Sequence, residues 1–117
     1  MLSAAYRTNF QTALAATVVA IKTTGGKLFG VSASNGGTVS AWLQFFDVTA
    51  ADVTIGTTAP KFSIPIVKGA SATDVAALSD MWPDGVDFQN AISVAATTDA
   101  DGSTGTSVAL DANFFYR

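Results

Sequence analysis

Apolar and polar residues alternate with a period of two along most of this chain. The clearest run spans residues 38–47, where one face carries Val39, Ala41, Leu43 and Phe45 and the other carries Ser40, Trp42, Gln44 and Phe46. Similar alternation covers residues 61–67, 86–95 and 107–117. A strand with one buried face produces this period because successive side chains point to opposite sides. The pattern therefore predicts β-strands in all four segments.

Turn-forming residues separate the apolar runs. Residues 24–26, Thr-Gly-Gly, stand between apolar stretches at 16–22 and 27–33 and predict a tight hairpin. Further turn signals lie at residues 35–37, at 49–52 before a short strand at 53–56, at 83–85 before Val86, and at 99–103.

Three segments depart from this regular pattern. Pro65 lies inside a strand pattern and cannot donate a ladder hydrogen bond, which predicts an edge strand or a bulge. Residues 72–80 predict either one or two helical turns or a loop. Residues 1–15 mix helical spacing with strand-forming residues, and we interpret them as an extended N-terminal arm.

Strand patterns recur about every 8–15 residues, which is typical of sandwiches and barrels and not of βαβ units. The sequence therefore predicts an all-β protein, an antiparallel β-sandwich of about seven or eight strands. Both a jelly-roll-like and an immunoglobulin-like strand order remain open. The predicted organisation is an arm at residues 1–15 and a single domain at residues 16–117.

The composition indicates a subunit of an assembly. Charged residues make up 13% of the 117 residues, about half of the ~25% usual in soluble domains, and 49% are hydrophobic. Interface cores are depleted of charge, so we expect other proteins to cover much of the surface. A neutral soluble monomer rich in Ser and Thr is the alternative.

Charge and hydropathy argue against two other kinds of partner. The net charge is −3, and the six basic residues do not cluster, so we expect no nucleic-acid partner. The most apolar run, residues 12–21, is too short for the ~20 residues that a membrane-spanning helix needs, so we expect no membrane partner.

Few residues of catalytic type are available. The chain contains no His, Cys or Glu, so we expect no enzyme and no cofactor. Asp99 and Asp101 precede Gly102 in a D-x-D-G pattern, which fits a turn better than a weak cation site because no Glu follows. Asp80 and Asp84 flank Trp82, which predicts either a sugar-binding ring or, more simply, a core residue.

Aromatic residues on predicted outer faces are candidate interface anchors. Trp42 and Phe46 share the face opposite Leu43, so they point outward unless the strand is central or a loop covers it. Phe115 presents the same alternative. The full set of candidate interface residues is Tyr6, Phe10, Trp42, Phe46, Trp82 and Phe115.

Several strand-and-turn motifs resemble small structural proteins of tailed bacteriophages over about residues 17–117. They are Lys27-Leu28-Phe29-Gly30-Val31, Trp42-Leu43-Gln44-Phe45-Phe46-Asp47, residues 57–66, Gly85-Val86-Asp87-Phe88, residues 91–98 and Phe114-Phe115-Tyr116. The resemblance implies a virion component similar to capsid decoration (cement) or head-fibre proteins. Its implied partners are the major capsid protein and further copies of itself, most simply a trimer, on the capsid surface.

Two other functions stay open on the sequence. The first is a tail, baseplate or fibre module of the same kind of particle. The second is a carbohydrate-binding β-sandwich that uses Trp42 or Trp82 to stack on a sugar.

Overall fold

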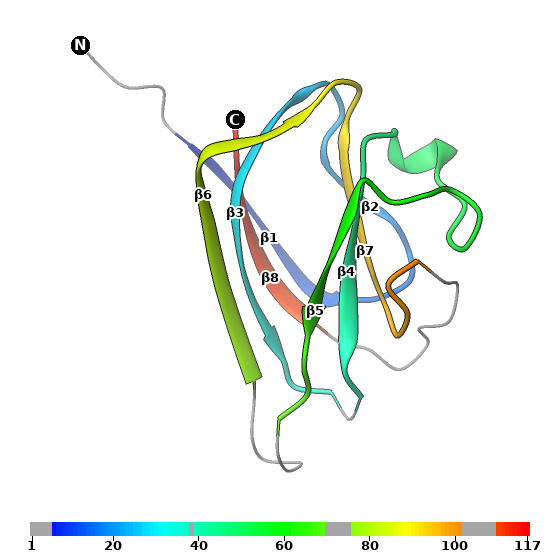
Figure 1. Cartoon of the computed structure of the whole chain (residues 1–117), viewed down its shortest axis with the longest axis vertical. Helices are drawn as coiled ribbons and strands as arrows, with labels where there is room; N and C mark the ends of the chain where they lie inside the picture. The colour runs from blue at the N-terminus through cyan, green and yellow to red at the C-terminus, as the bar shows by residue number, and fades with distance from the viewer. Residues whose placement is uncertain (1–5, 38, 70–75, 102–109) are drawn as a thin grey trace.

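The protein is a two-layer β-sandwich (Figure 1). The structure is a computed structural model that describes residues 6–37, 39–69, 76–101 and 110–117. Sheet A has the strand order β1-β8-β3-β6, sheet B has the order β2-β7-β4-β5, and all neighbours are antiparallel. The prediction of an antiparallel all-β sandwich of seven or eight strands is confirmed. The strands are β1 (Arg7–Leu14), β2 (Val19–Lys22), β3 (Gly26–Asn35), β4 (Ala41–Phe46), β5 (Phe62–Ile66), β6 (Ala76–Phe88), β7 (Ile92–Thr97) and β8 (Leu110–Tyr116), with one 3₁₀ turn, η1 (Ala50–Asp52), between β4 and β5.

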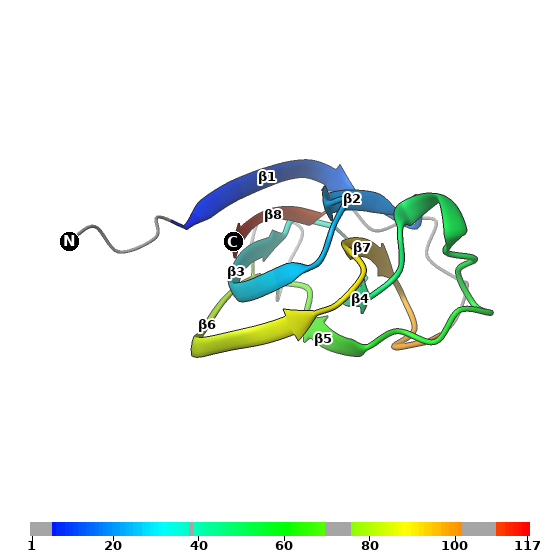
Figure 2. The same cartoon turned by 90° about the horizontal axis from the view of Figure 1, so that it is seen from above.

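At each side of the sandwich, an edge strand of one sheet lies next to an edge strand of the other (Figure 2). Strands β1 and β2 form one side, and strands β5 and β6 form the other. Strand β5 is an edge strand, as Pro65 predicts, because an edge tolerates the missing N–H. Each sheet therefore has two edge strands, which pair with a further strand on one side only among the described residues.

The core lies between the sheets and is filled by the alternating residues that the sequence pattern identifies. Apart from Phe46, which lies on the outer face of sheet B opposite Ser93, the largest fully buried apolar side chains are Phe45, Phe114, Leu28, Leu43, Ile66, Ile92, Leu110, Val31 and Val94. Phe45 stacks on Phe62 at 4.7 Å between ring centroids and meets Phe114 edge-on at 5.9 Å. These aromatic contacts join strands β4, β5 and β8 across the two layers.

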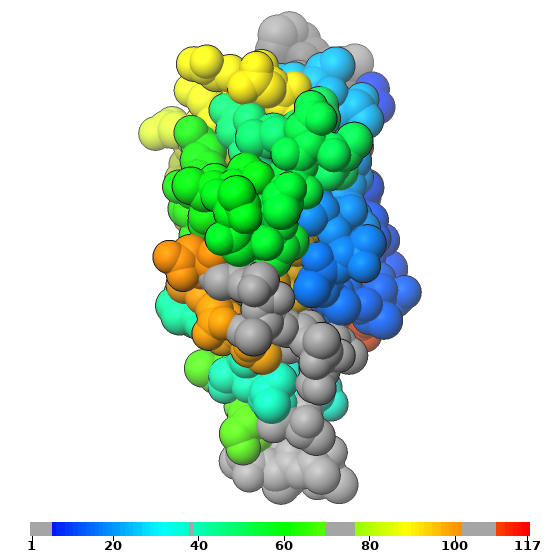
Figure 3. Space-filling view, turned by 90° about the vertical axis from the view of Figure 1, so that its right-hand side faces the viewer, coloured from blue at the N-terminus to red at the C-terminus, as the bar shows by residue number. Residues whose placement is uncertain are grey.

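The outer face of sheet B is covered by the chain itself. Gln44, Ser93 and Thr97 lie on this face, and all three are fully buried. Ser93 Oγ donates to the Val48 carbonyl at 2.7 Å, and Gln44 Nε2 donates to the Asp99 carbonyl at 3.0 Å. Residues 47–61 and 98–101 therefore lie over the sheet, as the green and orange segments of Figure 3 show.

The predicted N-terminal arm is wrong for the residues that the structure describes. Residues 7–14 form strand β1, which pairs with β8 from Arg7 opposite Tyr116 to Leu14 opposite Leu110. Leu14 is buried in the core. The pairing partner lies about one hundred residues away, so the local pattern gave no sign of it.

The predicted hairpin at residues 24–26 is also wrong. Strand β2 pairs with β7 in sheet B, whereas β3 pairs with β6 and β8 in sheet A. The segment between them therefore crosses from one layer to the other. Ile21 and Leu28 therefore enter the core from opposite sheets.

Strand β6 replaces two predicted features. It runs through residues 83–85, where we expected a turn, and through residues 76–80, which we expected in a short helix or loop; the remainder of that segment, 72–75, lies outside the described residues. The turn residues form a bulge instead. The register moves from Leu28 opposite Val86 to Gly30 opposite Met81, and Gly85 has φ +73°. The predicted strand at 53–56 is absent, and turns follow η1 there.

Candidate interaction surface

The outer face of sheet A is the open face of the sandwich. Two cross-strand rows define it by register: Thr8, Phe115, Gly30 and Met81, and next to it Phe10, Asn113, Ser32 and Ser79. Paired residues project to the same side of a sheet. The row between them holds Phe114 and Val31, which are buried in the core. Both defining rows therefore face outward, and together with Tyr6 they form what we call the sheet A outer face.

Large apolar side chains stand exposed on this face. Phe10 is 57% exposed, Met81 is 53% exposed and Tyr6 is 54% exposed. Among the described residues, Val67 is the only other large hydrophobic residue with comparable exposure, and it follows β5 in sheet B. Phe10 and Met81 lie on the two edge strands of the face, with the half-buried Phe115 on β8 between them. Several exposed apolar residues on one open sheet face make that face a candidate interaction site.

An aromatic cluster lies at one end of the sheet A outer face. The Tyr6 ring lies 4.7 Å from the Phe29 ring, and the Arg117 guanidinium lies 5.4 Å above the same ring. Phe29 is buried, yet it lies outside the central core because it occupies the bulge between Leu28 and Gly30. The cluster fixes the Tyr6 side chain, so its exposed area is presented without a large ordering cost.

The face is close to neutral. Its central positions are Ser32, Ser79 and Asn113, and Ser79 Oγ lies 3.2 Å from Ser32 Oγ as a hydrogen-bonding partner across the strands. Asp111 lies toward the far end of β8, where its carboxylate accepts the Ala13 N–H at 3.1 Å. Small hydroxyl and amide side chains around aromatic and Met residues match the composition of protein–protein interfaces.

The six predicted interface residues divide between three environments. Tyr6, Phe10 and Phe115 lie on the sheet A outer face. Phe46 is 0% exposed, so its assignment as a surface anchor is corrected: β4 is a central strand, and both of its faces are buried. Trp42 is half-buried opposite Pro65 and Thr97 in sheet B. Trp82 is half-buried and meets Phe62 edge-on at 5.9 Å against the core.

Sequence reasoning missed Met81. Met81 follows directly after residues 72–80, the segment predicted as a helix or loop, so no strand pattern was assigned to it. Met81 lies over Gly30, since a Cβ at that glycine would collide with the Met81 sulfur. Because Gly30 has no side chain, the Met81 side chain can pack over it on the sheet A outer face.

A hollow of about 550 Å³ lies between residues 56–60, residues 62–63 and residues 100–101. Its lining mixes apolar side chains such as Phe62 and Pro60 with the Thr and Ser hydroxyls and the Asp101 carboxylate. The described part of the chain contains no group of three or more metal-ligating acids that could hold an ion, and Gly102 of the D-x-D-G pattern lies outside it. Within the same residues, no helix has the length and apolar character to cross a bilayer.

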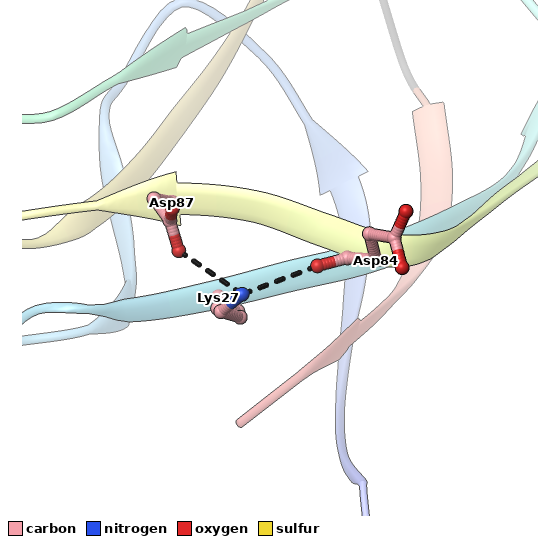
Figure 4. A network of polar contacts seen from close by, with 3 residues as sticks. All are labelled: Lys27, Asp84 and Asp87. Atoms are coloured by element: carbon pink, nitrogen blue, oxygen red, sulfur yellow. Dashed lines mark hydrogen bonds and ion pairs between the residues drawn. The ribbon is translucent and has the colours of Figure 1, made fainter.

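The edge of sheet A at β6 carries a small polar network (Figure 4). Lys27 Nζ lies 3.4 Å from the Asp87 carboxylate and donates to the Asp84 carbonyl at 3.2 Å. Both side chains of the ion pair are largely solvent-exposed, so it contributes little to stability. The two contacts of Lys27 nevertheless link β3 to the bulged part of β6.

Comparison with known proteins gives no match: no family model, no curated protein and no solved structure is significantly similar to this chain.

Proposed function

We propose that this chain is a virion structural protein of a tailed bacteriophage, a capsid decoration protein that binds the outer shell as a symmetric oligomer, most simply a trimer. The observation that carries the proposal is the sheet A outer face, an open, near-neutral sheet surface with exposed Phe10, Met81 and Tyr6. The resemblance of the sequence motifs to phage structural proteins is the reason for proposing a phage particle.

The proposed mechanism is stabilisation by binding. A protein that binds only the mature shell shifts the equilibrium toward that shell. Many weak contacts per particle add through multivalency, so no single contact has to be strong. A flat face rich in Ser, Asn and aromatic residues suits such broad contacts, since desolvating it costs less than desolvating charges.

A non-enzymatic role agrees with the residues available. The chain has no His, Cys or Glu, and its exposed aromatic residues lie on a sheet face and not around a cluster of acids. The carbohydrate-binding alternative relies on Trp42 or Trp82. Both rings are half-buried, and Trp82 packs against Phe62, so neither presents a fully open face for a sugar.

The test is the copy number of this chain relative to the major shell protein in purified particles, measured by quantitative mass spectrometry. A ratio near one, or a simple fraction of one, is expected for a protein spread over the shell lattice. A ratio of a few copies per hundred would replace decoration by the tail, baseplate or fibre role. Complete absence would refute both, and glycan binding lost in Trp42→Ala would then support the carbohydrate-binding role.

A further inference from the structure

The two edges of sheet A carry opposite charge. At the β6 edge, Asp80, Asp84 and Asp87 are all exposed. Lys27 offsets only one of them, Asp87 (Figure 4). Asp80 and Asp84 have no ion pair with any residue that the structure describes. This edge is therefore acidic, and no further strand pairs with β6 on this side in the part of the chain that the structure describes.

The opposite edge is basic. A hollow of about 470 Å³ lies where β1 and β2 meet, and its lining residues are Arg7, Ile21, Lys22, Thr23, Tyr116 and Arg117. Three of the six basic residues of the whole chain, including both arginines, line this one hollow, and no acid does. Arg7 and Lys22 have no ion-pair partner among the described residues.

The register places the basic and acidic groups at the same end of the sheet. Arg7, Tyr116, Leu28 and Val86 form one continuous row from the β1 edge to the β6 edge. Asp84 and Asp87 lie beside Val86 on β6, just as Lys22 and Arg117 lie near Arg7. Strands β1 and β6 also run in opposite directions, since three antiparallel pairings separate them.

We propose that a second copy of this chain occupies each edge: the β6 edge of one copy joins the β1 edge of the next in a continuous antiparallel sheet. This inference deepens the self-association of the proposed function and rests on it. Without a register slip, Arg7 of the next copy lies beside Val86, two residues after Asp84, whose carboxylate has no ion pair among the described residues. Complementary charge at that end favours this pairing over edge-to-edge contacts of like sign.

The same register brings the exposed apolar side chains together. Thr8 of the next copy lies beside Met81, and its Phe10 lies beside Ser79, one position diagonally from Met81. Phe10 and Met81 are the exposed large apolar residues of the two edge strands, and both project from the outer face. Diagonal neighbours of this kind are within reach of aromatic side chains.

The edge strands limit where backbone pairing can form. Pro83 lacks an N–H, and the bulge at Gly85 disrupts the strand around it, so the new ladder runs along residues 76–81 of β6. At the other end of the contact, Arg7 of one copy and Asp84 of the other attract each other by their opposite charges. Because the contact uses two different edges, it is heterologous, and the closed symmetric form of such a contact is a ring such as the trimer of the proposed function.

A cysteine cross-link tests this contact, because the natural chain contains no Cys. Full-length Thr8→Cys and Met81→Cys proteins are mixed and oxidised. A disulfide-linked dimer is expected in the mixture, and much less is expected from either variant alone. Thr8→Cys mixed with Thr54→Cys, an exposed position on the covering loop of sheet B, is the matched control. Equal cross-linking in the control, or none in the test mixture, would overturn the proposal.

Charge reversal gives a second readout. Arg7→Glu alone and Asp84→Lys alone are each expected to weaken self-association roughly tenfold in sedimentation equilibrium, while the double variant Arg7→Glu/Asp84→Lys, in which every contact again joins opposite charges, restores it. In a contact between two β1 edges or two β6 edges, like charges would face each other both before and after the reversal, so unweakened association of the single variants would overturn the proposal. These experiments use the isolated chain, so their failure leaves the copy number in particles unaffected, and absence from particles leaves the cross-link unaffected.

Discussion

The Asp47 carboxylate at the end of β4 accepts the backbone N–H of Asn90 at 2.7 Å. It also accepts the N–H groups of Gln89 and Ala91, at 2.9 and 3.3 Å. One side chain thereby holds the whole connection between β6 and β7, which belong to different sheets. Asp47 is the last residue of the aromatic strand motif, and the structure gives that position a physical role.

We predict that Asp47→Ala lowers the free energy of unfolding by about 1.5–3 kcal/mol, because three backbone donors lose a charged acceptor. Asp47→Asn is expected to lose less, since the amide keeps one acceptor oxygen. Urea denaturation at neutral pH measures both variants. A loss under about 0.5 kcal/mol for Asp47→Ala would mean that water replaces the carboxylate without cost.

The same site predicts a pH dependence. Burial acts to raise the pKa of Asp47, but the three N–H donors and nearby Lys61 outweigh it, so the pKa lies below its usual value. A depressed pKa contributes stability above the unfolded-state value of about 4, and that stability is lost as pH falls through the folded value. Thermal melts between pH 6 and pH 2 should therefore show a smaller acid-induced decrease for Asp47→Asn than for the wild type.

We predict that Gly30→Ala destabilises the sandwich by about 1–3 kcal/mol. A Cβ at this position would lie 2.7 Å from the Asp80 carbonyl oxygen and would collide with the Met81 sulfur. The Met81 side chain can move, whereas the backbone carbonyl cannot move freely. Adding Met81→Ala should therefore recover only part of the loss in urea denaturation, and full recovery would show that the backbone contact is unimportant.

Truncation to Ala should destabilise the protein strongly at Phe46 and hardly at all at Phe10. Phe46→Ala is expected to cost about 3–5 kcal/mol of unfolding free energy, because the side chain is fully buried. Phe10→Ala is expected to change stability by no more than about 0.5 kcal/mol, because its ring is mostly exposed. Similar losses in both variants would contradict the assignment of Phe10 to an open surface.

Particle binding should depend on the sheet A outer face. Phe10→Ser is expected to lower retention of the protein on purified particles at least several-fold, with an unchanged melting temperature. Val67→Ser is the matched control, because Val67 is equally exposed but follows β5 of sheet B. Equal retention of the two variants in a co-sedimentation assay would remove this face from the proposed interface.

Removing residues 1–12 should destabilise the domain. The deletion removes most of β1, including the residues paired with β8 from Tyr116 to Ala112. Each lost backbone hydrogen bond contributes about 0.5–1.5 kcal/mol, so a loss of at least about 2 kcal/mol is expected in urea denaturation. A truncated protein with full stability would show that β1 is a dispensable attachment to the sheet.

The sequence by itself determined the fold class, most of the core and the edge position of β5. Period-two alternation identifies buried residues such as Leu43 and Phe114 because each strand exposes only one face to the interior. The sequence also shows the many turn-forming residues and the small number of charged residues. These features are local, and each is set by a few neighbouring residues.

Only the tertiary structure decided which strands pair and which faces stay open. The residues that pair β1 with β8 are about one hundred positions apart, and no local pattern encodes a partner at that distance. Phe46 and Phe10 both lie on the outer face of a sheet, yet one lies beneath the covering loops and the other lies in solvent. Burial depends on what packs above a face, and that is a property of the assembled layers and not of the strand alone.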